Sequence, residues 1–177
     1  SELQRIENII TEFLVLAKPQ AVQYREKDVN LIVQETIDLL HAEALLCNVI
    51  FFPALSPDAL MLYCEPNQLK QVFINILKNA IESMKKGGCI RIVTELNDDQ
   101  YMKVSITDEG GGISPEKLKK LGEPFYTTKE RGTGLGLMVS YKIIEEHGGK
   151  IEVESELGKG STFHLFFPRE EDPRQES

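Results

Sequence analysis

Two asparagines lie one helical turn apart in the segment NILKNAIESM, whose other residues are largely apolar. On a helix Asn75, Asn79 and Glu82 share one face. Asparagine is a mediocre helix former, so a pair on one face of an apolar helix suggests a function. A carboxamide oxygen is a hard ligand that suits Mg²⁺, and phosphates can complete the octahedron of that ion. The alternative is that neighbouring core groups simply satisfy both amides.

A glycine-rich segment, DEGGGI, begins at Asp108 directly after a predicted strand. Its glycines let the backbone approach a ligand closely. A carboxylate buried at the end of a strand needs a hydrogen-bond donor, and the exocyclic amino group of adenine would provide one. The segment therefore indicates an adenine pocket at Asp108, although an ordinary strand-to-helix turn would have the same composition.

A second glycine-rich segment, GTGLGL, spans residues 132–137 and leads into a predicted helix. The amino end of a helix presents unpaired N–H groups and partial positive charge, which suit phosphate. The segment is not a dinucleotide fingerprint, because no buried strand precedes it and the G-x-G-x-x-G spacing is absent. Nor is GKGST a P-loop, because glycine follows Lys159. Residues 123–129, just upstream, have the character of a mobile lid or of a surface loop.

Hydrophobic periodicity places these segments on a mixed set of helices and strands. The polar stretch up to Lys27 is a linker or an edge strand. Asn30 is the expected N-cap of one helix, and Pro66 the expected first-turn residue of the next. The predicted helices are 3–17, 30–44, 66–84 and 135–147, with a short one after the first glycine segment. The predicted strands are 49–53, 59–64, 89–96, 101–107, 150–155 and 161–168.

Composition limits the classes of function. The 177 residues carry a net charge of −8, and this acidity argues against non-specific nucleic-acid binding. Cys47, Cys64 and Cys89 form no C-x-x-C pair, which predicts reduced, partly buried thiols of a cytoplasmic domain. The sequence shows no signal peptide or membrane-spanning run. Because it opens without Met inside a helical pattern, we expect a fragment of a longer protein, which a membrane segment elsewhere could anchor.

In their order, these motifs resemble the Bergerat-type ATP-binding domain of sensor histidine kinases. NILKNAIES is similar to the N box of that family, DEGGGI to its first glycine box, EPFYTTK to its F box and GTGLGL to its second glycine box. GKGSTF matches the closing segment, and RIENIITEFLVLAKP resembles the second helix of the dimerisation and phosphotransfer hairpin. The resemblance covers roughly residues 1–168 and is nearest to the sporulation kinases of endospore-forming bacteria.

The resemblance implies an α+β fold. The expected architecture is an α/β sandwich with three helices on a mixed sheet of about five strands, preceded by one hairpin helix. The implied domains are the hairpin helix at 1–19, the catalytic ATP-binding domain at 20–168 and a disordered tail at 169–177.

The resemblance also implies a site for ATP and Mg²⁺. Asp108 should accept a hydrogen bond from the adenine amino group, with Thr162 supporting it. Asn79 should hold Mg²⁺ with help from Asn75, and Lys129 should reach the γ-phosphate; Asn75 and Lys129 are thus the expected catalytic residues. The residues expected to bind the nucleotide are Asn75, Lys78, Asn79, Asp108, Gly110, Gly112, Ile113, Phe125, Tyr126, Lys129, Gly132, Thr133, Gly134, Leu135, Gly136, Leu137 and Thr162.

The implied function is transfer of the γ-phosphate of Mg·ATP to a histidine on an upstream helix. From there the phosphate would pass to an aspartate in the receiver domain of a response regulator, as in the sporulation phosphorelay. The resemblance further implies a homodimer through the hairpin helices, a possible protein inhibitor and no nucleic-acid partner. His41, His147 and His164 lack the sequence context of the phosphoacceptor, so this fragment alone is not expected to phosphorylate itself.

The same fold also serves proteins of different function. ATPases such as DNA gyrase carry a glutamate base one turn before the magnesium asparagine. That position is Asn75 here, and a carboxamide cannot take a proton from water at neutral pH. This favours transfer to a protein acceptor over hydrolysis. A serine kinase of the anti-sigma type and a non-enzymatic scaffold are two further hypotheses.

Overall fold

The computed structural model describes residues 2–17, 22–98, 100–123 and 135–169, excluding the side chains of residues 12 and 15–17. In chain order the elements are α1 (Glu2–Ala17), β1 (Arg25–Asp28), α2 (Val29–Leu46), β2 (Val49–Ala54), β3 (Met61–Cys64), α3 (Pro66–Ser83), β4 (Gly88–Asp98), β5 (Tyr101–Asp108), α4 (Pro115–Leu118), α5 (Leu135–Glu146), β6 (Lys150–Glu156) and β7 (Gly160–Pro168). Within these ranges, no helix has both the length and the apolarity needed to cross a membrane.

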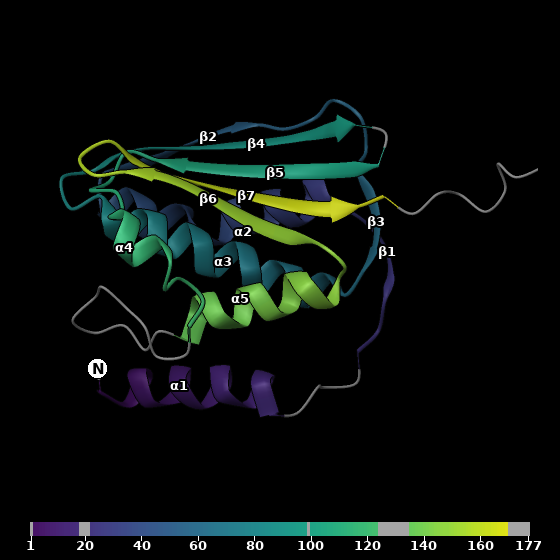
Figure 1. Cartoon of the computed structure of the whole chain (residues 1–177), viewed down its shortest axis with the longest axis horizontal. Coiled ribbons are helices and arrows are strands. Elements are labelled where there is room, and N and C mark those ends of the chain that lie inside the picture. The colour runs from purple at the N-terminus through teal and green to yellow at the C-terminus, as the bar shows by residue number, and fades with distance from the viewer. Residues whose placement is uncertain (1, 18–21, 99, 124–134, 170–177) are drawn as a thin grey trace, which may run out of the picture.

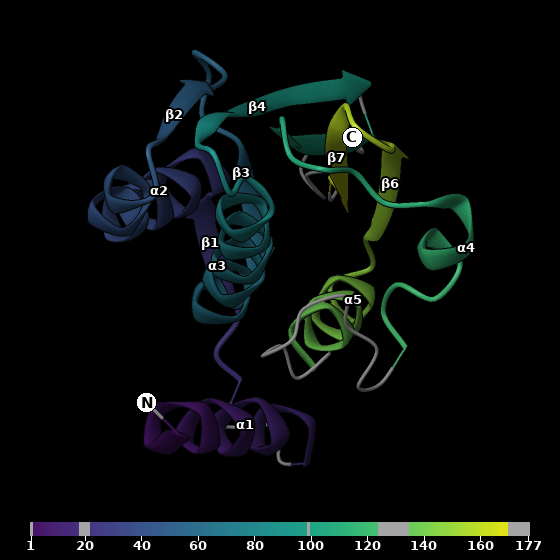
Figure 2. The ribbon, with the colours of Figure 1, turned by 90° about the vertical axis from the view of Figure 1, so that its left-hand side faces the viewer.

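A five-stranded mixed sheet forms one layer of the fold. Its strand order is β2-β4-β5-β7-β6, with β2 parallel to β4 and every other neighbouring pair antiparallel. Helices α2, α3 and α5 lie against one face of this sheet (Figures 1 and 2). The expected α+β sandwich of three helices on a mixed five-stranded sheet is therefore confirmed.

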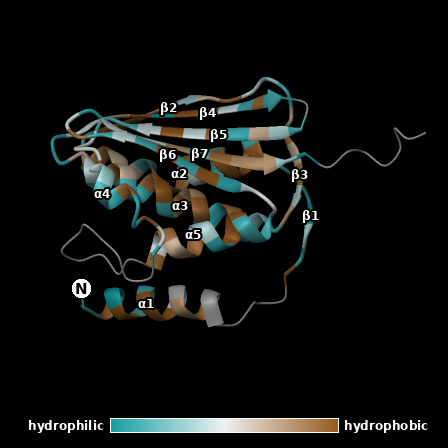
Figure 3. Cartoon of the chain, viewed as in Figure 1, coloured by the Kyte–Doolittle hydropathy of each residue, from teal (hydrophilic) through white to brown (hydrophobic). Residues whose placement is uncertain are grey.

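The core fills the space between these helices and the sheet (Figure 3). Strand β5 alternates throughout and β7 does so from Ser161, so every second side chain points inward. The inward residues are Met102, Val104 and Ile106 on β5, and Phe163, Leu165 and Phe167 on β7. Helix α3 meets them with an apolar stripe that includes Phe73, Ile76 and Leu77, each about 1% exposed. Burial of this stripe fixes which face of α3 remains for polar groups.

The starts of α2 and α3 are set by acidic caps. Asp28, rather than the predicted Asn30, caps α2, because its Oδ1 accepts hydrogen bonds from the backbone N–H of Asn30 and of Leu60, both at 3.0 Å. The Asn30 side chain is used elsewhere and donates to the carbonyls of Ser56 and Asp58. The prediction of Asn30 as the N-cap is therefore wrong, because its side chain is held by the loop carbonyls and Asp28 takes the position instead. Pro66 opens α3 as predicted, after its N-cap Glu65.

A separate two-stranded sheet joins β1 to β3. The end of the polar stretch, from Arg25, forms β1, which pairs antiparallel with β3, so the edge-strand interpretation is confirmed for these residues alone. Cys64, at the end of β3, is fully buried, and burial raises the pKa of its thiol to about 11. Cys89 is half-buried, but the prediction of a partly buried thiol is wrong for Cys47, which lies exposed at the C-terminus of α2.

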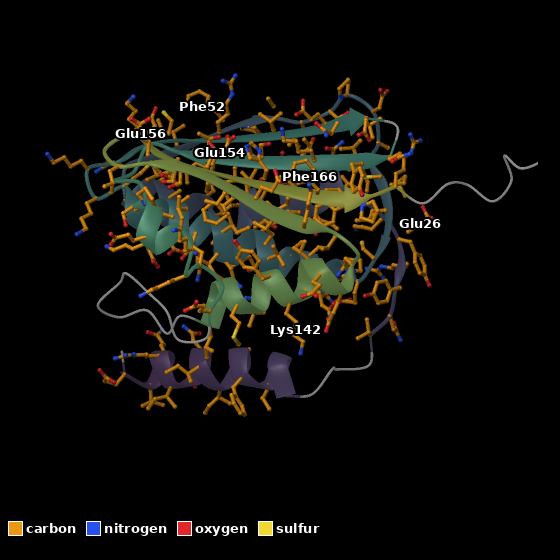
Figure 4. The ribbon with its side chains drawn as sticks, viewed as in Figure 1. Glu26, Phe52, Lys142, Glu154, Glu156 and Phe166 are labelled. Carbon is orange, nitrogen blue, oxygen red and sulfur yellow. The ribbon has the colours of Figure 1, made fainter. Side chains whose placement is uncertain are left out.

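Helix α1 lies alongside α5, on the side of α5 that faces away from the sheet (Figure 1). Lys142 projects from α5 toward it (Figure 4). Among the described side chains of α1, Leu3, Ile6, Ile10, Phe13 and Leu14 are exposed, from 49% for Leu14 to 71% for Leu3, whereas Ile9 is half-buried. The helix therefore contacts the domain while most of its described apolar residues stay exposed.

Replacing Phe73 tests the assignment of the core. Phe73→Ala should lower the free energy of unfolding by about 3–5 kcal/mol, because it removes a ring from the centre of the helix–sheet interface. The matched control is Phe52→Ala on β2, whose ring is 53% exposed on the face of the sheet away from the helices (Figure 4). This control should cost less than about 1 kcal/mol. Urea unfolding of both variants measures the difference, and equal losses would contradict the assignment.

Candidate functional site

Asp108 ends β5 on the core face of the sheet and is only 5% exposed. Its Oδ1 accepts a hydrogen bond from the backbone N–H of Gly110 at 2.8 Å, and the backbone of Ser161 donates to the same carboxylate. The hydroxyl of Ser83 lies 3.3 Å from Oδ1 and 2.8 Å from the carbonyl of Ala80, so two acceptors compete for its one proton. Burial raises the pKa of Asp108, and these hydrogen bonds oppose the rise.

Ser161, and not Thr162, is the partner of Asp108 on β7. The register pairs Asp108 with Ser161 and Thr107 with Thr162. Side chains alternate along a strand, so the hydroxyl of Thr162 lies on the opposite face, 3.0 Å from that of Thr107. Glu154, the partner of Thr162 on β6, is seen on this outer face (Figure 4). The expectation that Thr162 supports Asp108 is therefore wrong.

Two glycines of the first glycine-rich segment meet neighbours that leave no room for a side chain. A Cβ on Gly110 would collide with the side chain of Ser83 and lie 2.9 Å from Asp108 Oδ1. Gly112 has φ +74°, and a Cβ there would collide with the carbonyl group of Glu156. The segment can pass this close to Asp108 and to the β6–β7 turn only because these positions are glycines.

Two serines connect the first glycine-rich segment to β6 and β7. The backbone N–H of Ile113 donates to Ser155 Oγ at 2.7 Å, and the hydroxyls of Ser155 and Ser161 lie 2.7 Å apart. Ser155 Oγ also donates to the carbonyl of Gly160 at 3.0 Å. Ile113, an expected site residue, is thus held against β6, whose Ser155 in turn contacts Ser161 on β7.

Asn75 joins α3 to the start of α5. Its Oδ1 accepts from Gln71 Nε2 at 2.9 Å, while its Nδ2 donates to the carbonyl of Gly136 at 3.0 Å and to Ser140 Oγ at 3.3 Å. Leu135 and Leu137 flank this contact, the former buried and the latter half-buried against the core. On the same helix Asn79 is half-buried and Lys78 is exposed. The structure therefore brings the asparagine helix and the end of the second glycine-rich segment together.

Six of the expected nucleotide residues lie outside the part of the chain that the structure describes. They are Phe125, Tyr126, Lys129, Gly132, Thr133 and Gly134.

Several groups at the site were not anticipated from the sequence. Gln71 and Ser83 extend the Asn75 and Asn79 pair to four polar residues at intervals of four on α3, a spacing that the sequence does contain. Ser161 could have been found from the alternation of β7, because Phe163, Leu165 and Phe167 point inward at the same parity. Ser140 has no comparable signal, since its role depends on how α5 packs against α3.

The three histidines lie at three different elements: His41 on α2, His147 directly after α5 and His164 on β7. His147 Nε2 accepts from the backbone N–H of Glu65 at 3.2 Å, so the proton of the ring is on Nδ1, which donates to the carbonyl of Ile143 at 2.7 Å. His164 lies between Ser105 and Glu154 on the outer face of the sheet. His41 is exposed on α2.

Residues 64–171 match the family described as histidine kinase-, DNA gyrase B- and HSP90-like ATPases. This match and the geometry around Asp108 agree, and the chain belongs to this family of nucleotide-binding domains. The predicted likeness to sensor histidine kinases is confirmed by individual relatives. The chain is 64% identical over 168 residues to sporulation kinase E of Bacillus subtilis (strain 168), an alignment that covers 95% of this chain and 23% of that kinase. It thus spans less than a quarter of that relative.

Solved structures give the same result. The catalytic domain of histidine kinase ThkA is 34% identical with a TM-score of 0.74, covering 82% of this chain and 95% of that domain. A longer structure of ThkA, in complex with the response regulator protein TrrA, is 32% identical with a TM-score of 0.80, covering 96% of this chain and 48% of that one. The fold is thus that of a histidine kinase catalytic domain.

Alanine substitutions at Gly112 and at its neighbour Gly111 test whether the loop requires glycine at position 112. Gly112→Ala should lower the free energy of unfolding by about 1–3 kcal/mol, because it combines positive φ with a collision at Glu156. Gly111→Ala is the matched control, since a Cβ there meets nothing within 4 Å, and it should change stability by less than about 0.5 kcal/mol. Chemical denaturation compares the two variants, and a stable Gly112→Ala protein would contradict this account of the loop.

Burial of Asp108 predicts a pH-dependent gain in stability for Asp108→Asn. The raised pKa of Asp108 means that folding favours the protonated acid, so its contribution to stability is present at low pH and is lost as pH rises through the folded-state pKa. Asparagine is neutral throughout. The melting temperature of the variant, relative to the unmodified chain, should therefore increase from about pH 4 to about pH 7. Thermal unfolding across this range measures it, and a flat or falling difference would refute the prediction.

Proposed function

We propose that this chain is the ATP-binding catalytic part of a histidine kinase, which transfers the γ-phosphate of Mg·ATP to a histidine on a separate helix. The observation that carries the proposal is the buried carboxylate of Asp108. A carboxylate accepts about four hydrogen bonds, and donors from Gly110, Ser83 and Ser161 leave capacity for one more. The amino group of adenine is a donor of the right chemistry for that remaining position.

The residues present fit such a ligand. Gly110 and Gly112 let the first glycine-rich segment lie close against Asp108 and the β6–β7 turn, and the half-buried Asn79 lies on the polar stripe of α3 between Asn75 and Ser83. Among the described residues, no group of three or more His, Cys, Asp or Glu side chains could hold a metal ion. The proposed direct ligand of Mg²⁺ is therefore the Asn79 carboxamide, with the remaining positions left to phosphate and water oxygens.

Phosphoryl transfer requires mainly positioning and stabilisation of charge, and bound Mg²⁺ would neutralise part of the phosphate charge. In this proposal Asn75 assists at the metal side from its place between Gln71 and α5. Lys129 is proposed to reach the γ-phosphate, with Lys78 near the phosphates. Phe125 and Tyr126 are assigned to the lid.

The second glycine-rich segment, Gly132, Thr133 and Gly134 with Leu135 to Leu137, is proposed to surround the phosphates. The proposed domain limits are 1–19 for a hairpin helix, 20–168 for the catalytic domain and 169–177 for a tail. The exposed apolar residues of α1 support the first of these, because such a helix requires a partner.

The proposed partners follow from the class. A histidine-bearing helix would receive the phosphate, and a receiver domain of a response regulator would accept it next. ThkA has been solved in complex with the response regulator protein TrrA, which supports a response regulator as one of these partners. Dimerisation through hairpin helices and control by a protein inhibitor belong to the same proposal, with the sporulation phosphorelay as its setting because of the identity with sporulation kinase E.

The direct test supplies the chain with Mg·ATP labelled on the γ-phosphate and with a second chain that carries a histidine hairpin. Label that appears on the second chain, is labile to acid and is accompanied by little free phosphate supports the kinase. Rapid release of free phosphate without labelling supports an ATPase and contradicts the proposal. Omission of the second chain is the control.

Asp108→Asn should weaken ATP binding by at least about tenfold, because it alters a buried, charge-assisted hydrogen bond. Asp58→Asn, which changes an exposed carboxylate in the β2–β3 loop, is the matched control and should leave affinity unchanged. Isothermal titration of ATP into each folded variant measures the dissociation constants. Equal affinity of the Asp108 variant and the unmodified chain would exclude Asp108 from the nucleotide site.

A further inference from the structure

A chain of hydrogen bonds links the middle of α3 to the first turn of α5. It runs from Gln71 Nε2 to Asn75 Oδ1, and from Asn75 Nδ2 to the carbonyl of Gly136 and to Ser140 Oγ. Ser140 Oγ in turn donates to the same Gly136 carbonyl at 2.9 Å. We call these four residues the α3–α5 relay.

The relay fixes the direction of the Asn75 carboxamide. Gln71 presents a donor, so the oxygen of Asn75 points to Gln71 and its two N–H protons are used by Gly136 and Ser140. The reversed amide would set oxygen against the carbonyl oxygen of Gly136. Ser140 is fully buried, so no water would replace a lost partner there without cost.

The relay also sets where α5 begins relative to α3. Gly136 is the second residue of α5, and a Cβ on it would lie 3.7 Å from Asn75 Cγ, an ordinary contact distance. Asn79 follows Asn75 by one turn of α3. The relay therefore determines the distance from the amino end of α5, where N–H groups can meet phosphate, to the Asn79 carboxamide.

We propose that Gln71 and Ser140 are positioning residues for the phosphates of the bound nucleotide, acting through Asn75. This inference rests on the proposed function, because it assigns roles within the same site. The relay holds the amino end of α5 and Asn79 in the arrangement that binds phosphate, while Asp108 and its glycines recognise the base independently.

The test compares the binding of ATP with the binding of adenosine. Ser140→Ala removes one acceptor of Asn75, and Gln71→Met removes the donor that orients it with little change in length. Each variant should weaken ATP binding by about five- to tenfold, the range expected for a lost buried hydrogen bond. Adenosine, which lacks phosphates, should bind each variant within about twofold of the unmodified chain. A general loss of structure would weaken the binding of both ligands. A loss of ATP affinity with unchanged adenosine affinity is therefore specific to positioning of the phosphates.

A double variant tests whether the two residues act through one group. If both act through Asn75, then Gln71→Met combined with Ser140→Ala should weaken ATP binding no more than about twofold beyond the weaker-binding single variant. Independent contributions would multiply instead and would overturn the relay.

The matched control removes a similar hydroxyl elsewhere. Thr36 is fully buried on α2, and its Oγ1 donates to the carbonyl of Ile32 at 2.8 Å, the same i to i−4 contact that Ser140 makes with Gly136. Thr36→Val should leave both affinities unchanged. Melting temperatures of all variants verify folding at the temperature of titration.

The possible outcomes distinguish a failure of the relay hypothesis from a failure of the proposed nucleotide site. If ATP and adenosine weaken in parallel, or if neither changes, the relay does not position phosphates and the inference is overturned, even though the nucleotide site stands. If the unmodified chain binds neither ligand, the proposed function itself fails. A selective loss of ATP affinity in both single variants supports the inference.

Discussion

Burial of one carboxylate connects the elements of this fold. Asp108 points inward at the end of β5, where an ionised group without partners would be costly. Its donors come from the loop that follows, from the end of α3 and from β7. Each donor fixes a relation between elements: position 110 must lack a side chain, Ser83 must face the sheet, and β7 must present Ser161 across from β5. The requirement to satisfy one group therefore places the helix layer, the sheet and the first glycine-rich segment relative to one another.

Helices α3 and α5 pack antiparallel, and polar contacts lie at both ends of their interface. Near one end Asn75 donates to the carbonyl of Gly136, and at the other the backbone N–H of Glu65 donates to Nε2 of His147. Apolar contacts between them are non-directional and permit sliding, whereas hydrogen bonds do not. The polar ends therefore set the register of the pair, and the apolar middle supplies the cohesion. A single interface thus provides both stability and the alignment on which the proposed phosphate site depends.

Much of this arrangement follows from the sequence, and its failures have physical causes. Periodicity located the helices and strands because their apolar faces have to be buried. The cap of α2 was misassigned because Asp28 and Asn30 both suit that role, and only the loop that contacts Asn30 decides between them. Thr162 was assigned without regard to strand parity, which places Ser161 inward instead. Ser140 could not have been found at all, because its partner lies 65 residues away across a helix pair whose packing the sequence does not specify.

The small sheet formed by β1 and β3 gives the chain a mechanical property. Arg25 pairs with Cys64, which directly precedes Glu65 at the start of α3, and the ring of Tyr24 lies 5.6 Å from Tyr63 and 5.2 Å from His147. Force on β1 is therefore applied at the start of α3, at the end of α5 and, through Asp28, at the start of α2. From Glu65 to Asn75 a helix rises about 15 Å. Tension on the leading segment therefore enters the fold at the same helix pair that the α3–α5 relay holds in register, within about three helical turns of Asn75.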